Sequence, residues 1–337
     1  MTSSFPENPA LVRARRGGEI ESQHRGAWVL VDTSGAALEG AGAFEEPVFA
    51  RSSVKAFQAL PLVESGAAER FAYGDAELAL ALSSHNAEAV HTDGVRVILD
   101  RLGLSVADLQ CGAQQPSDPG ARAALRAGGE EPTALHNNCS GKHAGFLALT
   151  THLGASVADY LDPDGEPQLL VRQALADMSG VDSERLWYAI DGCSAPTWRL
   201  PLAGLATAFA RVANPEGLQR PRRDACIWMQ RAVAAHPGMI AGEHQRLCTD
   251  LARVTEGRLF PKIGAEGVYG IGVRGGDRGL AVKMDDGVAR GLHAVVIALL
   301  ERFGFATRAE LDALAVWRGD PITNWAGQEV GSLEVVV

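Results

Sequence analysis

The stretch Arg51-Ser52-Ser53-Val54-Lys55 places a serine three residues before a lysine, at the start of an expected helix. Residues i and i+3 share a helix face, with Cβ atoms about 5–6 Å apart, so the lysine amine can reach the serine oxygen. A helix N-terminus also favours negative charge, which would stabilise a developing alkoxide. The stretch therefore predicts that Ser52 is a nucleophile and that Lys55 is its base. A helix-capping serine followed by a solvated lysine would give the same spacing.

Lysine is rare in this chain, which gives Lys55 more weight. Of the 31 lysine and arginine residues, four are lysines and 27 are arginines. A lysine can lose its proton when it is buried or lies beside another cation, whereas an arginine keeps its charge. A position that retains lysine is therefore a candidate for a base or a metal ligand. The four are Lys55, Lys142, Lys262 and Lys283.

The composition excludes several classes of protein. The 337 residues carry a net charge of -10, and 46% of them are hydrophobic. Such an acidic, ordinary globular composition has no basic footprint for nucleic acid or for an anionic membrane. No apolar run approaches the roughly 20 residues of a membrane span. The polar start of the chain also lacks the apolar segment of a secretory signal, so we expect a cytoplasmic protein.

The two ends of the chain have strand patterns. Residues 21–50 are strand-like around the run Trp28-Val29-Leu30-Val31-Asp32. Residues 258–273 and 279–284 predict two further strands, and apolar residues at helical spacing predict a helix over 288–303.

The middle of the chain, from about 53 to 236, has mainly helical patterns. Two segments rich in Gly, Ser and Asn, at 136–143 and 191–196, are expected to be loops. We therefore expect one α/β (α+β) domain over 1–337. Its mixed, mainly antiparallel sheet would come from a lobe of residues 1–50 and 255–337, with a helical lobe, 51–254, inserted between them.

Two further motifs follow the first in order. Ser84-His85-Asn86 is an S-x-N in a polar break between helical patterns, and Lys262-Ile263-Gly264 is a K-x-G on an expected strand. The order S-x-x-K, S-x-N, K-x-G is similar to that of penicillin-binding proteins and serine β-lactamases. In such a site, Ser84 would relay a proton to the leaving group. Lys262 would hold Ser84 in place and add positive potential for an anionic substrate.

Six strings of residues extend this pattern over almost the whole chain. They are His24-Arg25-Gly26, Arg51-Ser52-Ser53-Val54-Lys55, Ser84-His85-Asn86-Ala87-Glu88, His136-Asn137-Asn138-Cys139-Ser140-Gly141-Lys142-His143-Ala144-Gly145, Asp191-Gly192-Cys193 and Lys262-Ile263-Gly264-Ala265-Glu266-Gly267. In these strings the chain resembles the bacterial asparaginase II family, typified by the inducible rhizobial enzyme. That family is similar in fold to β-lactamases and serine glutaminases.

The resemblance implies hydrolysis of a small-molecule substrate, L-asparagine, to L-aspartate and ammonia. It implies two Ser–Lys pairs, Ser52 with Lys55 and Ser84 with Lys262. The motifs do not distinguish asparagine from glutamine, so a serine glutaminase or another amidase stays an alternative. Two further alternatives are a β-lactamase-like hydrolase and a non-catalytic, zinc-stabilised binding protein. A homodimer is a candidate oligomeric state, although no interface pattern supports it.

The resemblance also implies a zinc site formed by Cys139, Lys142 and Cys193. Two thiolates suit zinc, but a lysine must be neutral to bind it, and the chemistry alone favours His143 as the third ligand. The ion would orient the α-carboxylate or α-amine of the substrate, and its charge would lower nearby lysine pKa values.

Four residues beside these motifs are candidates for binding the substrate or supporting the metal. Arg51 could hold a substrate carboxylate or form a surface ion pair. Asp191 could bind the substrate ammonium, support a zinc-bound water or cap a loop. Asn138 and His143 flank the metal loop and could orient its ligands.

Overall fold

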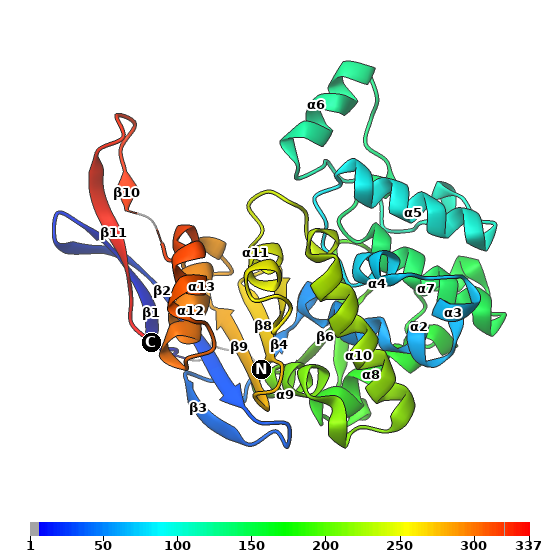
Figure 1. The fold of residues 1–337 in the computed structure, drawn as a ribbon, viewed down its shortest axis with the longest axis horizontal. Helices are drawn as coiled ribbons and strands as arrows, with labels where there is room; N and C mark the ends of the chain where they lie inside the picture. Colours follow the sequence, from blue (N-terminus) through cyan, green and yellow to red (C-terminus); the bar gives the residue numbers. More distant parts are fainter. Residues whose placement is uncertain (1–6, 320) are drawn as a thin grey trace.

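The main sheet of the computed structural model, which describes residues 7–319 and 321–337, is built from both ends of the chain (Figure 1). It has eight strands in the order β10-β11-β1-β2-β9-β8-β7, with β3 paired to β2. Their bounds are β1 Ala10–Arg16, β2 Glu19–Val31, β3 Ala37–Ala41, β7 Leu259–Gly264, β8 Val268–Val273, β9 Arg278–Met284, β10 Ile322–Thr323 and β11 Glu329–Val335. Every pairing is antiparallel. This confirms the prediction of a mixed α/β fold with an antiparallel sheet from both termini; residues 1–6 of the expected sheet lobe lie outside the described residues.

The prediction of one strand over 258–273 is wrong, because two strands, β7 and β8, occupy this segment. A turn separates them, in which Glu266 and Gly267 have φ values of 59° and 70°. Two successive left-handed residues are typical of the tight turns that join antiparallel strands. The chain therefore reverses at a point where its apolar pattern continues.

Helices fill most of the chain between the two halves of the sheet (Figure 1). Their bounds are α1 Lys55–Gln58, α2 Leu60–Glu64, α3 Ala67–Arg70, α4 Asp75–Ala81, α5 Ala89–Leu102, α6 Pro119–Gly128, α7 Ser140–Leu153, α8 Glu166–Ser179, α9 Leu202–Ala213, α10 Arg220–Ala235 and α11 Leu247–Val254. Two more, α12 Ala289–Arg302 and α13 Arg308–Ala313, lie between strands β9 and β10 of the main sheet. The helix expected over 288–303 is thereby confirmed.

Two expectations for the middle of the chain need correction. The segment also contains two strands, β5 (Trp187–Ile190) and β6 (Pro196–Pro201), which form a separate three-stranded sheet with β4 (Pro47–Phe49) from the strand-like stretch 21–50, in the order β4-β6-β5. Residues 140–143, expected in a loop, form the first turn of α7. The described residues contain no helix with both the length and the apolar character needed to cross a bilayer.

Helix α9 packs across β2, β8 and β9 and forms the centre of the core. Almost all of its residues are buried. The close approach depends on glycine in the sheet: a Cβ added at Gly279 would lie 2.0 Å from the carbonyl oxygen of Ala206. Backbone atoms cannot move aside as a flexible side chain can, so the helix and the sheet have no room for a methyl group here.

We predict that Gly279→Ala lowers the free energy of unfolding by about 1–3 kcal/mol, because overpacking forces α9 away from the sheet. Urea unfolding followed by circular dichroism measures this change. The matched control is Gly217→Ala, since a Cβ at Gly217 would meet nothing within 4 Å. Equal stability of the two variants would contradict this packing argument.

Candidate active site

A serine hydroxyl lies between two buried lysines at the centre of the candidate site. Ser84 Oγ is 3.0 Å from Lys55 Nζ and 2.9 Å from Lys262 Nζ. All three side chains are buried. They come from three distant parts of the chain, namely the start of α1, the segment between α4 and α5, and strand β7. The structure thus brings the three short motifs together at one point.

Glycines within the motifs allow this convergence. A Cβ at Gly264, in K-x-G, would lie 2.6 Å from the carbonyl oxygen of Ala50. A Cβ at Gly141 would lie 2.3 Å from the carbonyl oxygen of Leu80. Gly264 therefore lets β7 lie against the turn that carries Ser52, and Gly141 lets the start of α7 lie against the end of α4.

The two lysines have different sets of partners. Lys55 Nζ donates to the carbonyl oxygens of Ser83 at 2.5 Å and Asn138 at 3.4 Å, in addition to its contact with Ser84. Among the described residues, Lys262 Nζ donates to one carbonyl oxygen, that of Ile263 at 3.0 Å. An ammonium has three donors and no acceptor, so the partners of Lys55 suit the charged form. Lys262 has a free lone pair for the Ser84 hydroxyl proton if it is neutral.

The pKa shifts of the two lysines agree with a charged Lys55 and a neutral Lys262. Burial, followed by the charge of Lys55, lowers the pKa of Lys262 to about 7. Burial also lowers the pKa of Lys55, while the nearby Cys139 thiolate acts in the opposite direction. Two adjacent ammonium groups in a buried site repel each other, so it is unfavourable for both to stay protonated. Near pH 7 Lys262 is therefore about half deprotonated, and its neutral form lies within reach of Ser84.

Ser52 lies three residues before Lys55, on a turn that packs against β7, and its hydroxyl is not hydrogen-bonded to either lysine. It sits on a 3₁₀ turn, Arg51–Val54, rather than on an α-helix. Among the side-chain hydrogen bonds of residues 7–319 and 321–337, none involves the Ser52 hydroxyl, and no side chain caps the turn. The amine of Lys55 extends instead to Ser83 and Ser84. The Ser52 hydroxyl is thus left without a structural role.

Arg51 and Asp191 form an ion pair beside Ser52. Arg51 donates to Asp191 Oδ1 from Nε at 3.1 Å and from Nη2 at 2.7 Å, and its Nη1 lies 3.9 Å from Glu266 Oε1. Burial acts to raise the pKa of Asp191, but Arg51 and the Gly192 N–H lower it overall. The charge of Arg51 is therefore balanced within the protein.

The backbone on both sides of this ion pair is strained. Arg51 has φ 51°, Ser194 has φ 68° and Glu266 has φ 59°. Each non-glycine residue in this left-handed region costs roughly 1–2 kcal/mol. Such strain persists where surrounding contacts over-determine the backbone, and it gathers at functional sites.

The two cysteines and the lysine of the expected metal site also come together. Lys142 Nζ lies 3.2 Å from Cys193 Sγ. The proximity of Cys193 lowers the pKa of Cys139 well below its usual value, and the proximity of Cys139 raises the pKa of Cys193, so only one of the two thiols loses its proton readily. Burial acts to lower the pKa of Lys142, but the two sulfurs raise it overall. Without a metal, this trio is a thiolate next to an ammonium.

His143 does not take the third position that the chemistry alone favoured. Its Nδ1 lies 2.7 Å from the hydroxyl of Tyr160, and burial lowers its pKa well below the usual value. Asn138 places its Oδ1 3.1 Å from Cys139 Sγ and its carbonyl oxygen near Lys55. The described part of the chain has no cluster of three His, Cys, Asp or Glu side chains able to hold a metal. A metal here would therefore need Lys142 as a ligand.

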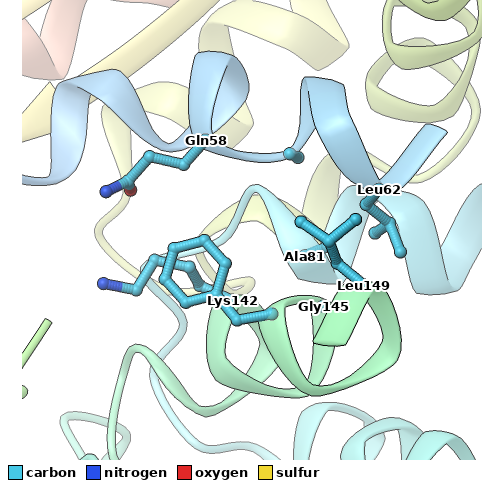
Figure 2. Close-up of a pocket in the computed structure, with 8 residues that line it drawn as sticks. Gln58, Leu62, Ala81, Lys142, Gly145 and Leu149 are labelled. Atoms are coloured by element: carbon cyan, nitrogen blue, oxygen red, sulfur yellow. The ribbon is translucent and has the colours of Figure 1, made fainter. Parts of the chain in front are cut away.

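A small cavity lies beneath Lys142, between α1, α2 and α7 (Figure 2). Figure 2 shows the polar ends of Gln58 and Lys142 at one side and Leu62, Ala81 and Leu149 at the other. The other residues that line this cavity are mostly apolar. Of the lining residues, Lys142 alone also belongs to the candidate active site. The cavity therefore does not suit a zwitterionic substrate.

Sequence reasoning missed Arg246, which donates from Nη2 to the carbonyl oxygen of Ser84 at 2.6 Å. It lies in no motif and is one of 27 arginines, so the sequence offered no signal for it.

Lys283, the lysine outside the site, donates to the carbonyl oxygens of Glu266 and Met284 and holds the β7–β8 turn.

A family model described as L-asparaginase II matches residues 12–335. The chain belongs to the L-asparaginase II family. This confirms the resemblance found in the sequence strings, and it makes the protein an L-asparaginase-type amidohydrolase that acts on a small-molecule substrate.

Comparison with curated proteins gives no match. Eighteen chains of solved structures are similar to this one. One is the crystal structure of a β-lactamase from Mycobacterium bovis, with 15% sequence identity and a TM-score of 0.39. The similarity covers 82% of this chain and 94% of that one.

Proposed function

We propose that the protein hydrolyses L-asparagine to L-aspartate and ammonia, with Ser52 as nucleophile. The observation that carries the proposal is the buried chain Lys55–Ser84–Lys262 beside an unbonded serine hydroxyl. A serine activated by a neutral amine is an established way to attack an amide carbonyl.

The three linked groups can make Lys55 the base for Ser52. At rest Lys55 holds a proton and Lys262 is neutral. Lys55 passes its proton to Ser84 Oγ, and Ser84 passes its own proton to Lys262. This shift leaves the net charge unchanged and gives Lys55 a lone pair. Because Ser84 is within hydrogen-bond distance of both amines, the transfer needs no rearrangement of the backbone.

Acylation then proceeds with protons conserved. Ser52 Oγ bonds to the side-chain amide carbon of asparagine, and its proton goes to Lys55. The C–N bond breaks as Ser84 donates a proton to the leaving nitrogen, and Lys55 reprotonates Ser84. Ammonia leaves a β-aspartyl ester on Ser52. Water hydrolyses this ester by the same route, with the neutral amine taking the proton of the water.

The other charged groups would bind the zwitterionic end of the substrate. Arg51 already balances Asp191, so the ion pair keeps the backbone of residue 51 in place and leaves a second oxygen of Asp191 for the substrate ammonium. Low exposure of these groups would strengthen each contact, because fewer waters compete for it.

We also propose a zinc ion held by Cys139, Lys142 and Cys193. The donor set fits: two sulfurs and one amine converge, and one of the thiols is already inclined to ionise. Binding would require loss of the Lys142 proton and of the remaining thiol proton, so affinity would increase with pH. When bound, the ion would supply positive charge that orients an anionic or amine group of the substrate.

We predict that Ser52→Ala reduces ammonia release from L-asparagine by at least about 10³-fold while the fold survives, because no other group would replace the nucleophile. L-Asparagine should be preferred over L-glutamine. A coupled ammonia assay measures both, with circular dichroism as the check on folding. The matched control is Ser156→Ala, since Ser156 is exposed and its side chain caps no helix. Full activity of Ser52→Ala would refute the assignment of the nucleophile.

For the metal, elemental analysis of purified Cys139→Ser should show zinc lost, because one of two thiolate ligands is replaced by a weaker oxygen donor. Cys226→Ser serves as control, since Cys226 is buried in α10 beside Arg222 and Glu64 and should leave the zinc content unchanged. Stoichiometric zinc retained in Cys139→Ser would rule out this ligand set.

A further inference from the structure

Arg246 is held rigidly beside the candidate catalytic serine. It is the residue that immediately precedes α11. Its Nη2 donates to the carbonyl oxygen of Ser84 at 2.6 Å, and its Nη1 donates to Asn86 Oδ1. Asn86 is itself fixed, because its Nδ2 donates to the carbonyl oxygen of His244 at 3.3 Å. Asn86, the third residue of the S-x-N motif, therefore orients the guanidinium of Arg246 beside Ser84, the first residue of that motif.

Arg246 forms no close ion pair in the described structure, although Glu88 acts on it from a longer distance to raise its pKa. Across residues 7–319 and 321–337, no salt bridge within 4.0 Å includes it. The side chain is nevertheless only partly exposed, and burial lowers its pKa. Arg51, on the other side of the site, is neutralised by Asp191. A desolvated cation without a counter-ion is costly, and an anionic ligand would remove that cost.

The guanidinium also has donors to spare. An arginine carries five N–H donors in a planar fork that matches a carboxylate. Two are used by Ser84 and Asn86. Three remain, on a side chain that is partly exposed. A carboxylate bound there would be held by a guanidinium that already contacts the backbone of Ser84, the serine between the two lysines.

We propose that Arg246 binds the α-carboxylate of the substrate and that Asn86 positions it for this task. This inference rests on the proposed asparagine hydrolysis and names the group that recognises the anionic end of the substrate. In L-asparagine two carbon atoms separate the carboxylate carbon from the amide carbon. Anchoring the carboxylate at a fixed guanidinium would select the substrate whose amide then reaches Ser52. L-Glutamine, with one more carbon, would present its amide at a different place.

The test compares substrates that differ by one charged group. The assays use Arg246→Gln and wild type with L-asparagine, with succinamic acid, which lacks the amine, and with 3-aminopropanamide, which lacks the carboxylate. In Arg246→Gln we expect KM to rise about 10- to 100-fold for the two carboxylates, the range for a lost charge-assisted hydrogen bond. Their kcat should change far less. The kcat/KM for 3-aminopropanamide should stay the same, and Arg246→Lys should recover part of the loss for the carboxylates.

A matched control keeps the readout specific. Arg253 lies on α11 and pairs with Glu243 at the surface, so Arg253→Gln should leave all three substrates unaffected. An equal loss for all three substrates in Arg246→Gln would show a merely structural role and overturn the proposal. Unchanged KM for L-asparagine would overturn it as well.

Calorimetry separates this inference from the proposed reaction, because it needs no turnover. Wild type should bind L-aspartate more tightly than β-alanine, which is the same molecule without the α-carboxylate, and Arg246→Gln should lose that preference. A preference retained in Arg246→Gln would overturn the role of Arg246. Failure of wild type to release ammonia from L-asparagine, with the calorimetric preference intact, would instead reject the reaction and keep the carboxylate site.

Discussion

The hydroxyl of Ser84 is shared by two buried lysines, and the rest of the site depends on this contact. Two ammonium groups at 3.0 and 2.9 Å from one oxygen, away from water, repel each other strongly. The repulsion is relieved when one of them gives up its proton. Folding thus produces a neutral amine near neutral pH without any separate base. The partners of the two amines, three acceptors for Lys55 and fewer for Lys262, indicate which one is neutral.

The other charged groups around this pair differ in whether a nearby opposite charge balances them. Lys142 contacts Cys193 Sγ and is stabilised as an ammonium by the two cysteines, and Arg51 is stabilised by Asp191. In the described structure Arg246 donates to two neutral oxygens and has no carboxylate paired with it. The site is therefore positive as a whole, although the chain carries a net charge of -10. Such local positive potential suits a substrate that carries a carboxylate and whose reaction develops an oxyanion.

Much of this arrangement could be predicted from the sequence, because short motifs carry it. The three motifs and the cysteines were recognisable by residue type and spacing, and strand patterns at both ends predicted the sheet. Strand β1 escaped notice because arginines occupy its outward positions while Val12 and Ala14 face the core. The sequence predicts a loop at the first turn of α7 because Gly141, which is needed for contact with Leu80, lowers helix propensity.

Other features depend on tertiary contacts that no local pattern encodes. The S-x-x-K spacing suggested a bond from Lys55 to Ser52, but the carbonyl of Ser83 and the hydroxyl of Ser84 attract the amine instead. Arg246 is near Ser84 only because α11 packs beside β7. Residue separation along the chain says nothing about either contact.

The scarcity of lysine allows a direct measurement of the shared proton. With lysine labelled at the ε carbon, NMR should show only four signals, one for each lysine in the chain. The signal that vanishes in Lys262→Met should titrate with a midpoint near pH 7, since the pKa of Lys262 is lowered to about 7. If all four lysines instead titrate near the usual value of about 10.4, no amine in the site is neutral at physiological pH, and the account of Ser84 and its two lysines is wrong.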